Sequence, residues 1–93
     1  MMKLQVALFN WLQIHIVSEQ RPDDGAAKET VQFFETILKE DHQLTSFEAC
    51  LDGSDERYVI TYWREEEMST EVFDREDAER LWQDIEANPK YNE

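Results

Sequence analysis

Glycine, proline and cysteine are scarce in this chain of 93 residues, which contains two, two and one of them, respectively. With only Gly25 and Gly53, the chain has no glycine-rich loop of the kind that holds nucleotide phosphates. Its single cysteine, Cys50, cannot form an internal disulfide, whereas small secreted domains usually carry several. We therefore expect no nucleotide cofactor and a reducing compartment, the cytoplasm.

Basic residues are also scarce, because nine Lys and Arg stand against 22 Asp and Glu and give a net charge of −13. Most of this excess lies in residues 47–93, which hold 15 acidic and five basic residues. Nucleic acids and anionic membranes are bound through basic side chains, so we expect neither as a direct partner. The charge is compatible with a basic protein partner, and also with a role in solubility alone.

Long apolar runs and catalytic motifs are missing as well. Asn10, Gln13 and His15 interrupt the apolar N-terminal stretch, whereas a membrane span needs about 20 largely apolar residues. The two histidines, His15 and His42, have no histidine or cysteine partner at metal-ligand spacing. The sequence thus predicts no membrane span, no catalytic residue, no metal site and no cofactor.

The residues that are present suffice for one folded domain. Hydrophobic residues make up 41% and aromatic residues 12% of the chain. A chain of this length buries about 60% of the surface that it exposes when unfolded, which is enough for a modest core. We expect a single compact domain over residues 1–93.

Hydrophobic periodicity predicts the helices and strands. Apolar residues alternate over residues 3–18 and indicate a strand, but Leu4, Leu8, Trp11 and His15 share a helical face and leave a helix as the alternative. Residues 21–41 carry a helical apolar stripe after acidic start signals. Three strand-like runs follow, separated by the turn sequence Asp52-Gly53 and by three glutamates.

A second helix is predicted near the end of the chain, with Asp74 as its N-cap and Asn88-Pro89 as its stop. The fold class is therefore α+β, with the order β-α-β-β-β-α or with a helix in place of the first strand. Sequential strands with short turns pair as an antiparallel meander, here of three to four strands. Both helices need an apolar surface, and one face of the sheet provides it.

The strand over residues 57–65 is apolar on both faces. Tyr58, Ile60 and Tyr62 alternate with Val59 and Trp63, so a sheet covered by helices on one face still shows large side chains on the other. We expect the two tyrosines to be the exposed pair, because a phenol group tolerates a wet rim while its ring offers contact area.

These features predict a small acidic, non-enzymatic protein-interaction or regulatory module. Its contact surface would combine Tyr58 and Tyr62 with an acidic rim formed by Glu65, Glu66, Glu67 and Glu71. The occupant is either a basic protein, whose site the module would mask, or a second copy of the chain. The alternative function is an enzyme for a small molecule or a metal, with clustered carboxylates such as Asp52, Asp55 or Glu71.

Overall fold

The computed structural model describes residues 2–87, which form an α+β fold. The helices are α1 (Leu4–Gln20), α2 (Gly25–Thr36), which continues into the π-helical segment η1 (Ile37–Asp41), and α3 (Arg75–Ala87). The strands are β1 (Leu44–Leu51), β2 (Arg57–Arg64) and β3 (Glu67–Asp74). The order is thus α-α-β-β-β-α, and the predicted helix stop at Asn88-Pro89 lies outside the described residues.

The predicted strand over residues 3–18 is wrong, and the helical alternative is the observed structure. Six side chains of α1 are buried, and many of the others are half-buried, because the sheet, α2 and α3 surround this helix. A helix that is covered on several sides is apolar on several sides, so its 3.6-residue period is weak. The alternation that indicated a strand comes from this all-round apolar surface.

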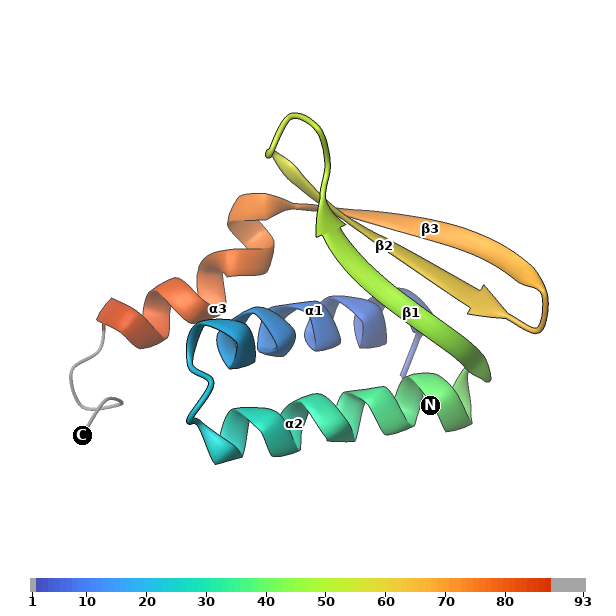
Figure 1. Ribbon diagram of the computed structural model, residues 1–93, viewed down its shortest axis with the longest axis horizontal. Helices are drawn as coiled ribbons and strands as arrows, with labels where there is room; N and C mark the ends of the chain where they lie inside the picture. Colours follow the sequence, from blue (N-terminus) through green and yellow to red (C-terminus); the bar gives the residue numbers. More distant parts are fainter. Residues whose placement is uncertain (1, 88–93) are drawn as a thin grey trace.

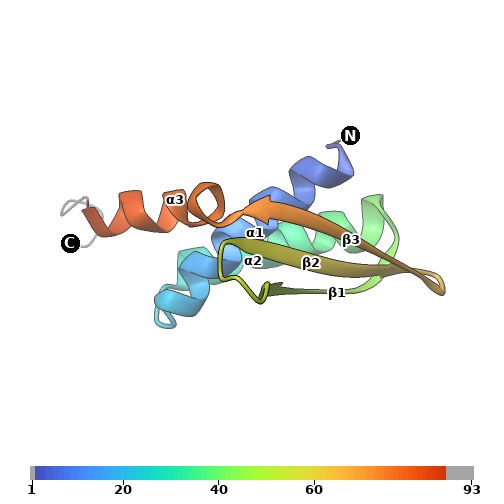
Figure 2. The same cartoon turned by 90° about the horizontal axis from the view of Figure 1, so that it is seen from above.

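The three strands form an antiparallel meander in the order β1-β2-β3. Figure 1 shows α1 and α2 on one side of this sheet, and Figure 2 shows the strands side by side from above. Side chains of α1 meet the outer strands through ring contacts, Trp11 with Phe47 of β1 and Phe9 with Phe73 of β3. The fully buried Ile60 of β2 completes this layer.

Helix α3 does not lie flat on the sheet as predicted but packs mainly along α1. Ala78 joins the main core, and Ile85 forms a second apolar cluster with Val17 of α1 and Ala27 of α2. Trp82 contacts both clusters. Helix α3 thus closes the side of α1 that the sheet and α2 leave open.

Acidic side chains begin two of the helices, as predicted. Asp24 accepts a hydrogen bond from the backbone N–H of Ala27 at 3.0 Å, and this bond holds the pKa of the Asp24 carboxyl below its usual value. Asp74 accepts one from the N–H of Asp77 at 3.3 Å.

The turn between β1 and β2 differs from the prediction in its conformation. Asp55, with φ 59°, takes the left-handed conformation, whereas neither glycine has a positive φ. Asp52 organises the turn by accepting hydrogen bonds from the N–H and Oγ of Ser54. Asp52-Gly53 therefore marks the turn correctly, but the special backbone geometry falls two residues later.

The turn between β2 and β3 contains an unfavourable residue that offers a test. Glu65 has φ 58°, which costs a residue with a side chain about 1–2 kcal/mol. We expect Glu65→Gly to raise the free energy of unfolding by about 1 kcal/mol, because glycine adopts this φ at no steric cost. Urea unfolding followed by circular dichroism measures the change.

Glu66→Gly is the matched control, because it removes the same charge from the same turn at a residue without a positive φ. It should leave stability unchanged or lower it by up to about 1 kcal/mol. Equal stabilisation by both substitutions would assign the effect to charge and would contradict the backbone explanation.

Candidate functional site

The face of the sheet opposite α1 and α2 is the most distinctive surface of the described residues. Phe47, Ile60 and Phe73 point to the helices, so the residues that alternate with them point away from the helices. We call this surface the open face. Its cross-strand rows are Cys50–Val59–Val72, Glu48–Thr61–Thr70 and Ser46–Trp63–Met68.

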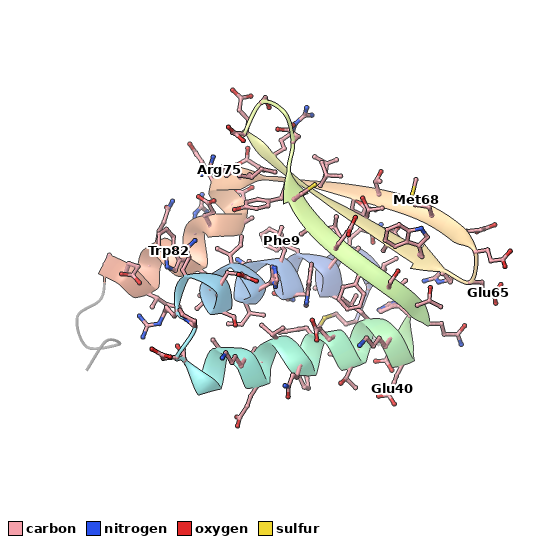
Figure 3. The ribbon with its side chains drawn as sticks, viewed as in Figure 1. Phe9, Glu40, Glu65, Met68, Arg75 and Trp82 are labelled. Carbon is pink, nitrogen blue, oxygen red and sulfur yellow. The ribbon has the colours of Figure 1, made fainter. Side chains whose placement is uncertain are left out.

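Apolar side chains of the open face are accessible. Met68 is 62% exposed and Val72 is 47% exposed, and Cys50 is also exposed. Val59 and Trp63 of the central strand are half-buried. Figure 3 shows Met68 pointing away from α1 and α2, while Phe9 lies between α1 and the sheet. The open face therefore presents two apolar rows with a threonine pair between them.

The tyrosines lie on the other face, so the expectation that they form the exposed pair is wrong. Tyr58 and Tyr62 alternate with the open-face residues and pack against the main core next to Ile60. The hydroxyl of Tyr58 donates a hydrogen bond to Glu79 of α3, so this ring packs under the sheet while its oxygen keeps a polar partner. Val59 and Trp63 take the place on the open face that the sequence assigned to the tyrosines.

The predicted acidic rim is divided between two places. Glu65, Glu66 and Glu67 are exposed at the tip of the β2–β3 hairpin, where the open face ends. Glu71 is half-buried and opposite Ile60, so it lies on the helix-facing side of β3. The three hairpin glutamates border the open face, and Glu71 does not.

Sequence reasoning missed Met68 and Val72. The two-residue turn Glu65-Glu66 pairs Arg64 with Glu67, which puts Met68 opposite Trp63 and Val72 opposite Val59. This register could have been predicted from the shortest possible connection between the two strands.

Known proteins offer no guide to this surface. The chain matches no family model, no curated protein and no solved structure.

Of the three acids considered for an enzyme, Asp52 and Asp55 share the β1–β2 turn, where the N–H of Asp55 donates to the backbone oxygen of Asp52 at 3.1 Å, but Glu71 lies away from this turn. Asp52 is occupied within its turn, where Arg57 also donates a hydrogen bond to it at 3.0 Å. Hydrogen bonds from Ser54 and Arg57 hold the pKa of the Asp52 carboxyl below its usual value. Glu71 points to the opposite side of the sheet from Arg57. Along β3 it is three residues from Asp74, the cross-strand neighbour of Arg57.

Hollows in the described part of the chain lie outside the open face. A hollow of about 310 Å³ is lined by Asp55, Glu56, Asp74, Arg75 and Glu76, and one of about 660 Å³ is lined by residues 20–26. Within residues 2–87, no group of three His, Cys, Asp or Glu side chains is arranged to hold a metal ion. No helix in the same range is long and apolar enough to cross a membrane.

A hydrogen-bond network joins the sheet to α3 beside the smaller hollow. The hydroxyl of Tyr58 donates to Glu79 Oε2 at 2.6 Å, and Arg75 Nε donates to the same oxygen at 3.0 Å. Arg75 Nη1 also donates to the backbone oxygen of Asp55. Partial burial and the Glu79 carboxylate raise the pKa of Tyr58 to about 12.

This network predicts a late tyrosine titration. In the folded protein, absorbance near 295 nm should show one phenol that ionises near pH 12, and Tyr58→Phe should remove this step. Glu79→Gln should lower its pKa, because the amide accepts the hydrogen bond without a negative charge. The phenol has a pKa of about 10 in the unfolded chain, so protonated Tyr58 stabilises the folded state. This contribution to the free energy of unfolding is complete below about pH 10 and is lost as the pH rises towards 12. A titration identical in Tyr58→Phe would contradict the assignment.

Proposed function

We propose that this chain is a non-enzymatic interaction module that binds a basic protein through the open face. The observation that carries the proposal is the accessibility of Met68, Val72 and Cys50 beside the half-buried Trp63 and Val59. Apolar and aromatic side chains at the centre of a surface with charges around it are the usual anatomy of a protein interface.

Charge supports a basic partner over a second copy. Residues 44–74, which contain the whole sheet, hold nine acidic and two basic residues. Arg57, one of those two basic residues, pairs with Asp52 at 3.0 Å. Two such faces would bring acids against acids, whereas a basic surface would gain both faster encounter and specificity. The single exposed cysteine supports a reducing compartment, the cytoplasm, as the place of action.

The test compares two variants of the protein as bait in a native lysate of the source cells. Met68→Ser with Val72→Ser changes two exposed residues of the open face, and Phe33→Ser changes a residue of α2 that is 59% exposed. We expect a basic protein to be retained by the wild type and by Phe33→Ser and to be lost from the double variant. Equal capture by all three baits would overturn the proposal.

Sizing chromatography at two protein concentrations distinguishes the second copy from another protein. We expect the same elution volume at both concentrations, because the acidic sheet opposes self-association. A dimer that forms at the higher concentration and is lost in Met68→Ser, Val72→Ser would assign the open face to a second copy and would contradict the basic partner.

A further inference from the structure

We infer that the open face receives a single cationic amphipathic helix of the partner, lying along the strands. This inference rests on the proposed function and names the element that the partner supplies. Four properties of the face favour a helix: its dimensions, the spacing of its apolar rows, its charge and the position of its apolar residues on the central strand.

The dimensions of the face fit one helix. Strand β2 has eight residues, which span about 26 Å at about 3.3 Å each. The axes of β1 and β3 lie about 10 Å apart, since neighbouring strands are separated by about 4.8 Å. A helix is about 10 Å wide and needs about 17 residues to cover 26 Å. One helix therefore covers the face along its length and across its width.

The apolar rows match the repeat of a helix. Val59 and Trp63 are four residues apart on β2, which corresponds to about 13 Å along the strand. Positions i+7 and i+8 of a helix lie on the same face as position i, and they are about 10.5 and 12 Å from it along the axis, which is within about 1–3 Å of the spacing of the rows. Thr61 and Thr70, with smaller side chains, lie between the rows. Successive apolar residues of such a helical stripe would contact first the row of Val59 and then the row of Trp63.

The acidic residues around the face favour a helix with basic residues on its flanks. Glu65, Glu66 and Glu67 are exposed at one end of the strands, and Asp55 and Glu56 are exposed at the other. Glu48 is exposed on β1, in the row between the two apolar rows. Lysine or arginine on the flanks and ends of the helix would pair with these acids, whose mutual repulsion would be relieved.

An added strand at the edge of the sheet explains the surface less well. Such a strand would lie beside β3 or β1, whereas Val59 and Trp63 belong to the central strand β2. In addition, Glu71 of β3 points to the helix-facing side, and inward-pointing charges are one device by which natural edge strands resist strand addition. A helix across the face covers the central strand directly.

The test uses two synthetic peptides of 18 residues with the same leucine and lysine composition. In one peptide the leucines follow a helical stripe, and in the other they alternate with lysine as in a strand. Binding at the open face is detected through Cys50, the one thiol of the chain, whose alkylation rate is measured by mass spectrometry. The measurements are made at about 0.15 M salt to limit binding by charge alone.

We expect the helical peptide to slow alkylation of Cys50 and the alternating peptide to leave it unchanged. Met68→Ser with Val72→Ser should weaken binding of the helical peptide by about tenfold or more, while Phe33→Ser should change it by less than about twofold. Thermal unfolding by circular dichroism confirms that both variants are folded.

Three results would overturn the inference. Protection of Cys50 by the alternating peptide alone, lost in the double variant, would mean that the face binds a strand, and the proposed function would stand. Protection by neither peptide would exclude a helix of this kind. If both peptides bound the wild type and the Met68→Ser, Val72→Ser variant equally well, the interaction would be due to charge. This result would also contradict the proposed use of the open face.

Discussion

Replacing Tyr58 and Tyr62 together by serine should lower the melting temperature by about 20 °C or more. Both rings pack against the main core on the helix-facing side of β2, and Tyr58 also donates a hydrogen bond to Glu79. Truncation of a fully buried aromatic side chain costs about 3–5 kcal/mol, so two half-buried rings should cost about 5 kcal/mol together. This approaches the whole stability of a domain of this size.

The matched control is Val59→Thr with Trp63→Thr on the open face of the same strand. Threonine keeps a β-branched side chain, and the core is not touched, so the cost should stay within about 1–2 kcal/mol. Thermal and urea unfolding by circular dichroism measure both pairs. If the open-face pair were as destabilising as the tyrosine pair, another part of the molecule would have to cover this face.

Trp82→Ala should cost about 3 kcal/mol. Trp82 is half-buried on α3 and contacts both apolar clusters, so its loss opens the contact between α3 and α1 at its centre. Its Nε1–H is buried without a hydrogen-bond acceptor among residues 2–87. The ring, and not the indole N–H, therefore provides the stabilisation.

Trp82→Phe separates these two contributions. Phenylalanine keeps an aromatic ring in the contact and removes a buried donor without a partner, so this variant should lose less than about 1 kcal/mol. Urea unfolding of both variants gives the comparison. A Phe variant as unstable as the Ala variant would mean that the N–H group contributes a bond, and an Ala variant within about 0.5 kcal/mol of the parent would mean that α3 is peripheral.

Elements with one apolar side could be predicted from the sequence. Helices α2 and α3 have a single stripe and acidic caps at Asp24 and Asp74, and local hydrogen bonds at both caps confirm the prediction. The meander of three strands follows from short connections between sequential strands. In these segments, local preference and tertiary packing favour the same structure.

The first element and the choice of sheet face depend on contacts that are distant in sequence. Helix α1 is covered on several sides, and only the packed structure determines which of its apolar residues meets which neighbour. The same holds for β2, where both sets of alternating residues are large, so pattern alone leaves the covered face open. The ring contacts of Phe9 with Phe73 and of Trp11 with Phe47 determine which face of the sheet α1 covers.

The central position of α1 has a consequence for synthesis on the ribosome. Helix α1 is made first, but the surfaces that cover it come from the sheet and from α3, whose Ala78 and Trp82 are the last to arrive at the main core. A nascent chain that ends before Arg75 would keep part of α1 exposed, and such apolar surfaces are what chaperones bind. We therefore expect folding to wait until α3 has left the exit tunnel and then to occur in one cooperative step.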